Sequence, residues 1–397
     1  MADIKEAVMN KDFREIGHCG GKLRVDVETG DDDSRAYSLG YSHSSAGPAA
    51  FFMIYAIPQG IPVATISTPG LGQEMPPPPV PGSFPLIIAS DSEGRFGHRC
   101  ESCGEYWRSS GAPSAWPLTC PYCGLRAPTH AFLTLGQRAY VSEFCELIES
   151  AVNAGESATI DMDALADKVG EDTERPRFYY SEVSQQNQFI CGACGAWNDV
   201  LGRYAYCSSC GTRNDVAELV LAIARIREQV NGGGAPDECV KGAVSAFDTA
   251  AKKIADELIR LVPMTTARRN RLKDKRFHDI RARATDINEL FGIDVFDGFQ
   301  QDDIDFTAMM FHRRHIYEHG GGEVDKKYIE ESGDISVRPK QTLRETKENV
   351  HRLAGLVTKM VRTLHKGFHD IFPAHPTPLK IEAEKQALMK SRQLGYR

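Results

Sequence analysis

The chain has 397 residues, with 47 Lys and Arg against 54 Asp and Glu and a net charge of −7. An apolar fraction of 41% and a charged fraction of 25% exclude a mostly disordered, collagen-like or purely coiled-coil chain. The acidic balance gives no overall attraction for nucleic acid, so such binding would need a local basic patch.

The sequence predicts a cytosolic (cytoplasmic) protein with no membrane partner. No apolar stretch approaches the roughly 20 residues that a spanning helix needs. The N-terminal segment has no apolar core, so it does not resemble a signal peptide. We therefore expect reduced thiols rather than disulfides.

The front of the chain, residues 1–95, has the pattern of a β-rich domain. Short apolar or alternating runs are bounded by Gly and Pro, as buried and half-buried strands are, at Lys22–Glu28, Phe51–Ile57, Ile61–Ile66 and Pro85–Ala89. Their spacing suggests a small sandwich or barrel. Residues 73–84 form a proline-rich loop. This domain is a candidate for binding a protein partner or ligand, although a rigid surface loop explains the prolines better.

Eight of the eleven cysteines form four Cys-x-x-Cys pairs, each with a glycine directly after its second cysteine: Cys100/Cys103, Cys120/Cys123, Cys191/Cys194 and Cys207/Cys210. Two such pairs can complete a tetrahedral thiolate site. The spacing predicts two zinc ribbons, at 96–135 and 181–214, with two structural zinc ions as cofactors. Disulfides, redox pairs and iron–sulfur ligation are the alternatives. Aromatic residues in both ribbons could stack on bases or cover the ribbon cores.

Helical patterns dominate the remainder of the chain. A helical insert over 136–180 contains expected helices at Ala139–Ala154 and Asp161–Val169 and a strand at Arg177–Tyr180. A helical bundle over 215–373 contains expected helices at Val216–Val230, Pro236–Leu261, Phe277–Phe291, Gln301–His319 and Lys340–Ile371. A charged C-terminal tail follows at 374–397. The fold class is therefore α+β and multidomain.

The bundle contains two polar segments of interest. Arg268–Arg283 is rich in Arg and Lys, which fits either phosphate contact or a solvated face. Phe311–His319 has three histidines, two arginines and a glutamate before three glycines. Imidazoles can move protons near neutral pH, and a guanidinium can hold a phosphate. This combination suits cleavage of RNA by its own 2′-hydroxyl, which needs no metal.

The pair Arg314 and His319, separated by four residues, resembles the Arg-x4–6-His motif of the HEPN superfamily. Arg313, His315 and Glu318 are supporting candidates, and the run Gly321–Tyr328 adds to the likeness. The resemblance implies a metal-independent endoribonuclease built as a homodimer, with RNA as partner. It also implies His319 in proton transfer and Arg314 in phosphate stabilisation, in a protein of defence or stress response.

The same residues allow other interpretations. His312, His315 and His319 share one helix face and could bind a metal with a neighbouring acid: Asp302, Asp303 or Asp305. The face could also be a polar subunit interface. The alternative function is therefore a non-enzymatic zinc-binding adaptor or nucleic-acid-binding regulator with an inactive bundle.

Overall fold

The protein has an α+β fold that divides into two compact units. The structure, a computed structural model, describes residues 21–31, 34–43, 50–66, 76–90, 94–110, 116–171, 185–273, 277 and 279–394. The first unit comprises residues 1–211 together with 375–397, and the second comprises residues 212–374. The expected strand at Arg177–Tyr180 lies outside the described residues, as does Cys19, one of the three cysteines that belong to no Cys-x-x-Cys pair.

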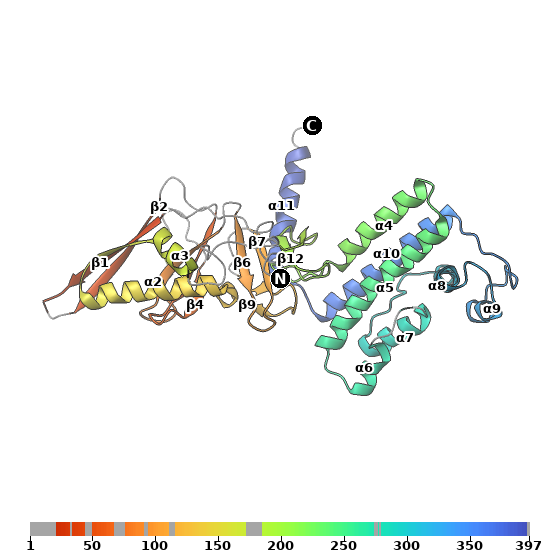
Figure 1. Cartoon of the computed structure of the whole chain (residues 1–397), viewed down its shortest axis with the longest axis horizontal. Helices are drawn as coiled ribbons and strands as arrows, with labels where there is room; N and C mark the ends of the chain where they lie inside the picture. Colours follow the sequence, from red (N-terminus) through yellow and green to blue (C-terminus); the bar gives the residue numbers. More distant parts are fainter. Residues whose placement is uncertain are drawn as a thin grey trace. The chain divides into compact units, whose positions relative to one another are not determined.

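Two small sheets and two helices share the core at the front of the first unit (Figure 1). One sheet has the order β10-β1-β2, and its strands are Ala158–Asp161, Gly21–Thr29 and Arg35–His43. The other has the order β4-β3-β5, and its strands are Pro62–Ile66, Phe51–Ala56 and Phe84–Ala89. The apolar alternation of the sequence is kept, since Leu23 and Val25 of β1 are fully buried. The sheets stay separate, so the described strands close no barrel.

The expected helical insert is part of this front core. Helix α2 (Leu135–Ala154) buries Tyr140, Phe144 and Ile148 among the residues of both sheets. Strand β10 extends the first sheet by pairing antiparallel with β1, and α3 (Met162–Glu171) follows it. The insert therefore has no core of its own, because its apolar face is satisfied only against the strands.

The two expected ribbons are joined into one four-stranded sheet. Its order is β11-β12-β7-β6, and the strands are Asn187–Ile190, Trp197–Val200, Tyr106–Ser110 and Arg95–Arg99. The pairing of β12 with β7 links the second ribbon to the first. A small hairpin of β8 (Leu118–Thr119) and β9 (Arg126–Ala127) and the short helix η1 (Thr129–Phe132) complete the first ribbon.

The segment expected as a charged tail forms helix α11 (Pro376–Leu394). It is anchored to the second ribbon, where the backbone N–H of His375 donates to the Cys210 carbonyl at 2.7 Å. Leu379 packs against the buried cysteines of that ribbon. Only the start of the helix is covered, since Pro378 is buried and Leu379 half-buried, whereas Ile381, Leu388 and Met389 are exposed.

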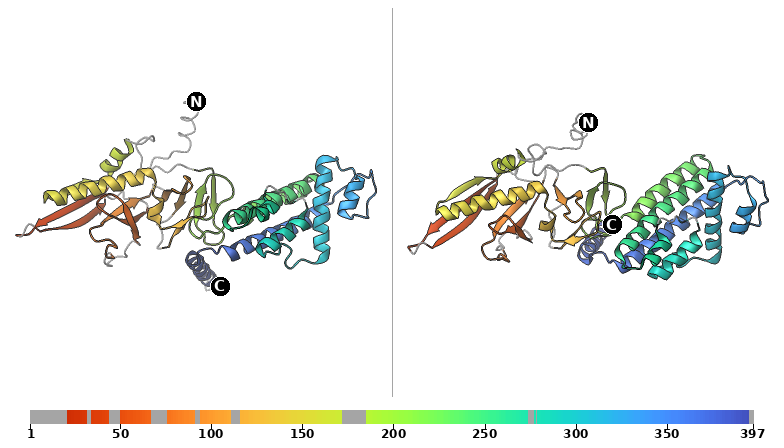
Figure 2. Two further views of the ribbon diagram at one scale, coloured as in Figure 1. Left: turned by 90° about the horizontal axis from the view of Figure 1, so that it is seen from below. Right: turned by 60° about the horizontal axis from the view of Figure 1, so that its bottom comes forward.

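The second unit is a helical bundle. Its helices are α4 (Asp215–Asn231), α5 (Pro236–Leu261), α6 (Thr266–Leu272), α7 (Ile280–Phe291), α8 (Gln301–His319), α9 (Lys326–Ser332) and α10 (Lys347–Ile371). Helices α4, α5 and α10 pack side by side, and α8 crosses one end of this group (Figure 2). Leucine and valine positions at seven-residue intervals in α10, among them Val350, Val357 and Leu364, are buried as predicted. No helix in the described part of the chain has an apolar stretch long enough to cross a membrane.

The expected start of the long helix at Lys340 was wrong. Helix α10 begins at Lys347, where the Thr346 side chain accepts a hydrogen bond from the backbone N–H of Asn349. The preceding residues instead pair with the segment after α8: the N–H of Leu343 donates to the Gly322 carbonyl at 2.8 Å. Gly321 and Gly322 have positive φ angles of 60° and 86°, which a glycine adopts without strain.

Candidate functional sites: two cysteine clusters and a histidine-lined cleft

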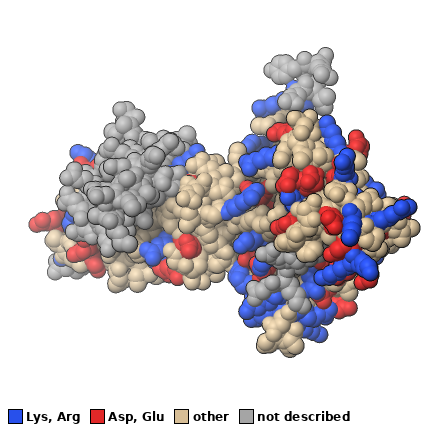
Figure 3. Space-filling model, turned by 45° about the vertical axis from the view of Figure 1, so that its right-hand side comes forward, with Lys and Arg blue, Asp and Glu red and all other residues tan. Residues whose placement is uncertain are grey.

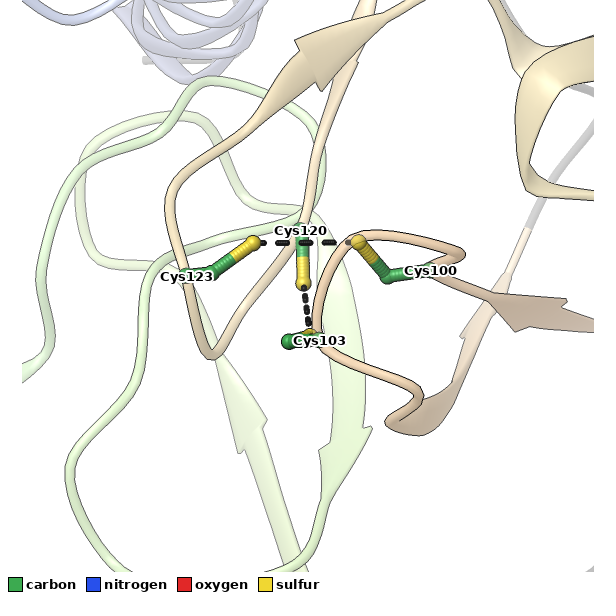
Figure 4. A group of neighbouring side chains, drawn as sticks. All are labelled: Cys100, Cys103, Cys120 and Cys123. Atoms are coloured by element: carbon green, nitrogen blue, oxygen red, sulfur yellow. Dashed lines mark hydrogen bonds between the residues drawn. The ribbon is translucent and has the colours of Figure 1, made fainter.

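Each cysteine quartet converges on one point. In the first cluster the Sγ atoms of Cys100 and Cys123 are 3.7 Å apart, as are those of Cys103 and Cys120 (Figure 4). The second cluster has the same geometry, with distances of 3.7 and 3.6 Å for its pairs Cys191/Cys210 and Cys194/Cys207. Four sulfurs about 2.3 Å from a central ion would be separated by about 3.8 Å. Both clusters are therefore suited to hold a metal ion.

The same local turn builds every cysteine pair. The residue after each second cysteine is a glycine with a φ between 71° and 77°: Gly104, Gly124, Gly195 and Gly211. Its N–H donates to the carbonyl of the first cysteine at 2.8–3.0 Å. At Cys100, burial raises the thiol pKa, but hydrogen bonds from the backbone N–H groups of Cys103 and Ser102 outweigh it and lower the pKa. At Cys103 and Cys120 burial instead raises the thiol pKa, because it outweighs the backbone hydrogen bonds that act to lower it there.

The three histidines of α8 line one cleft. His312, His315 and His319 face a cavity of about 840 Å³ between α7, α8 and α9. The His315 and His319 rings meet edge to face with centroids 4.8 Å apart. His312 is half-buried, and burial lowers its pKa. The His319 side chain is 62% exposed, so solvent and ligands reach it directly.

Two further cations reach the cleft from the facing helices. Arg281 of α7 and Lys327 of α9 both line it. Their partners are acidic: Arg281 pairs with Asp305, and Lys327 lies 3.7 Å from Glu331. The cleft therefore combines imidazoles and paired cations with the carboxyl groups of Asp279, Asp325, Glu330 and Glu331. No local sequence pattern indicated that α9 would contribute one of its walls.

Arg314 does not line this cleft. Its side chain is 10% exposed, and its guanidinium lies 2.7 Å from the Glu318 carboxylate one turn further along α8. Positions five apart are rotated by about 140° around a helix, yet the Arg314 and His319 side chains both approach the same Glu318 oxygen. The Glu318 carboxylate also lies 3.9 Å from Nε2 of His319. Within one chain, the structure brings His319 beside His315, and Nε2 of His319 lies near the same Glu318 oxygen that pairs with Arg314.

Arg313 is buried in a charged network that ties three segments together. Its guanidinium donates to Glu345 at 2.6 Å, to Asp334 at 2.8 Å and to the Tyr328 hydroxyl at 3.2 Å. The Asp334 carboxyl is partly buried, which raises its pKa, but hydrogen bonds from Ser336, Arg313 and Tyr328 lower it to about 2. Burial raises the pKa of Tyr328 to about 12. Arg313 therefore fixes α9 and the segment before α10 against α8.

The remaining candidates are largely engaged elsewhere. In the basic segment, Arg271 bonds Asp286 at 2.6 Å, and Arg283 bonds the same carboxylate at 2.8 Å. Among the described residues, only the two cysteine quartets bring three or more ligand atoms within 4.8 Å of one another. In the described part of the chain, the three histidines therefore form no metal site with Asp302, Asp303 or Asp305. The Asp303 carboxylate instead pairs with Arg352 at 2.8 Å.

Comparisons with known proteins give no relative for this chain: no family model, curated protein or solved structure matches it.

Proposed function

We propose that the helical unit is a metal-independent endoribonuclease of the HEPN type that acts as a homodimer, and that both cysteine quartets hold structural zinc. The observation that carries the ribonuclease proposal is the cleft lined by His312, His315 and His319. Adjacent imidazoles on an open surface are suited to take up and return protons near neutral pH. A cleft of about 840 Å³ has room for a nucleotide.

In this proposal His319 accepts the proton of an RNA 2′-hydroxyl as its oxygen attacks the adjacent phosphorus. The bond from phosphorus to the 5′-oxygen breaks, and the leaving oxygen takes a proton from a second imidazole, for which His315 is placed. The products are a 2′,3′-cyclic phosphate and a 5′-hydroxyl. Arg314 holds the phosphate oxygens once the phosphate has replaced Glu318 as its partner.

The dimer is proposed because, within one chain, Arg314 is paired with Glu318 and does not line the cleft that the histidines line. A two-fold axis near the end of α8 would place Arg314 of one subunit opposite His319 of the other.

The surface in view in Figure 3 has acidic side chains among the basic ones. RNA contact is therefore proposed for the cleft and not for a uniformly basic face.

Zinc is proposed because four thiolates at tetrahedral spacing are a soft donor set that zinc prefers. Such a site leaves no coordination position open, so the ions would stabilise the ribbons without taking part in the reaction. Elemental analysis of the purified protein should find two zinc ions per chain.

The test of the ribonuclease proposal is RNA cleavage by the full chain, with and without a chelator. We expect cleavage that survives brief chelation and falls about 10²–10⁴-fold in His319→Ala. His351→Ala is the matched control, because this histidine lies on α10 and not in the cleft. RNA with a 2′-deoxy residue at the cut site should resist cleavage. Equal cutting of DNA, or cutting that requires added metal, would contradict the mechanism.

One observation favours the adaptor as a second candidate. Arg313 is buried in its network and Arg314 is paired with Glu318, so neither arginine faces the cleft in the single chain. A bundle that only binds partners would have no need to bring them there. Absence of cleavage by wild type and variants that melt alike would favour this function.

A further inference from the structure

The two cysteine clusters are built on one continuous sheet. Strand β12 of the second ribbon pairs antiparallel with β7 of the first, with Asn198 opposite Ser109 and Asp199 opposite Arg108. The strands on either side, β6 and β11, pair with β7 and β12 respectively. Neither ribbon can lose its fold without exposing backbone groups of the other.

A buried ion pair crosses this junction. Arg108 donates to the Asp199 carboxylate through Nε at 2.7 Å and lies 2.6 Å from it through a terminal nitrogen. The two side chains are only 5% and 0% exposed. A buried charge without its partner is strongly unfavourable, so each residue requires the strand that carries the other.

Backbone hydrogen bonds also join the two clusters beside their sulfurs. The N–H of Thr119, just before Cys120, donates to the Ser208 carbonyl at 2.8 Å. In the other direction, the N–H of Tyr206, just before Cys207, donates to the Pro121 carbonyl at 2.9 Å. Each cluster therefore has one of its cysteine turns held by the other ribbon.

Asn198 connects the shared strand directly to a cysteine sulfur. Its side-chain oxygen accepts from the N–H and the hydroxyl of Ser208, both at 2.7 Å. Its amide nitrogen lies 3.6 Å from Sγ of Cys207. Cys100 and Cys120 of the first cluster pack in one core with Val200 and Ala205 of the second ribbon. The position of the sulfur atoms in each cysteine cluster thus depends on the strands of both ribbons.

We propose that the two cysteine clusters load metal cooperatively, so that an ion in either cluster raises the affinity of the other. The inference rests on the metal occupancy proposed above. Binding the first ion orders its own ribbon and, through β7 and β12, pre-forms the second site. Such coupling is reciprocal, and couplings of this kind typically amount to about 5–150-fold in affinity.

Native mass spectrometry of the wild-type chain during zinc addition tests this directly. Two equal and independent sites would leave about half of the chains with one zinc at half loading, whereas tenfold coupling lowers this fraction to about a quarter. We expect the one-zinc species to stay well below half. A fraction of half or more overturns the cooperativity. Failure to bind any zinc would overturn the metal proposal itself, which is a different result.

A variant pair locates the coupling. Arg108→Leu combined with Asp199→Leu keeps all eight cysteines and replaces the buried charges by apolar groups. We expect it to bind two zinc ions at high concentration, with the one-zinc fraction at half loading higher than in the wild type. The control is Lys168→Gln, which removes an exposed ion pair with Glu143 in the same unit. An unchanged one-zinc fraction in the double variant would exclude this ion pair as the link.

A ligand variant tests the reciprocal effect. Cys194→Ser removes one thiolate from the second cluster, and we expect zinc affinity at the intact first cluster to fall at least fivefold. Cys239→Ala is the control, because this buried cysteine lies on α5 and belongs to neither cluster. Unchanged affinity at the first cluster would show that the sites are independent.

Discussion

Arg314 and Glu318 form an ion pair one helical turn apart, with 2.7 Å between the guanidinium and the carboxylate. Arg314, which the HEPN-like motif would use to bind phosphate, is thus paired with a carboxylate of its own helix. In the proposed reaction, a phosphate would therefore compete with Glu318 for this guanidinium.

The first prediction concerns that competition. Glu318→Gln removes the competing charge, so we expect RNA to bind more tightly and its cleavage rate at low substrate to rise. Arg314→Lys should be impaired, because an ammonium cannot make a forked contact with phosphate. Binding and single-turnover cleavage assays measure both effects. Weaker RNA binding by Glu318→Gln would instead mean that the ion pair supports the site.

The second prediction concerns the network around Arg313. Arg313→Met leaves the Glu345 carboxylate, which is fully buried, and Asp334 without their cation. We expect a loss of about 3–5 kcal/mol in the free energy of unfolding, measured by chemical denaturation. Arg352→Met, which breaks the more exposed pair with Asp303, should cost below about 1 kcal/mol. Equal losses in both variants would contradict the structural role assigned to Arg313.

The third prediction is a pH dependence of stability that arises at His369. Its Nε2 accepts from the Arg213 N–H at 3.2 Å, so the ring must be neutral, with its proton on Nδ1 facing the Phe372 carbonyl at 3.1 Å. Burial, with a contribution from nearby His365, lowers the pKa of His369 to about 4. Asp215 and Arg213 act on the ring with opposite signs.

Because the folded pKa lies below the ordinary value of about 6.5, the unfolded chain binds more protons between these two values. The stability that neutral His369 contributes to the folded protein is fully present above pH 6.5 and decreases as the pH falls towards 4. His369→Gln should therefore show a shallower decline of Tm over this interval than the wild type. His351→Gln serves as the control, and identical slopes for wild type and His369→Gln would rule out this histidine as the source.

The fourth prediction concerns subunit composition. If Arg314 of one chain acts with His319 of another, the protein should be a dimer under the conditions in which it cleaves RNA. Mixing inactive Arg314→Ala and His319→Ala chains should restore part of the activity, because one of two composite sites would be intact. Light scattering and this complementation assay are the measurements. Full activity of a strict monomer would contradict the composite site.

Local features of the sequence determined the cysteine turns and most helices. A Cys-x-x-Cys-Gly segment folds into its turn through hydrogen bonds within six residues, and glycine supplies the required positive φ. The boundaries of α5 and α8 agree with the sequence prediction, because Pro236 opens the first and Gly320 follows the second. Apolar periodicity likewise identified the buried face of α10.

Only the tertiary structure decided which of these elements join. Strand β1 pairs with β10, although the whole first ribbon lies between them in the sequence. Arg108 likewise pairs with Asp199, which is 91 positions further along the chain. Arg313 and Arg314 are adjacent in sequence, yet one is fixed by Asp334 and Glu345 and the other by Glu318. Periodicity and turn chemistry are local properties of the chain. Strand pairing and buried charge pairs depend instead on which segments, far apart in the sequence, are buried against each other. That is determined only when the whole unit packs.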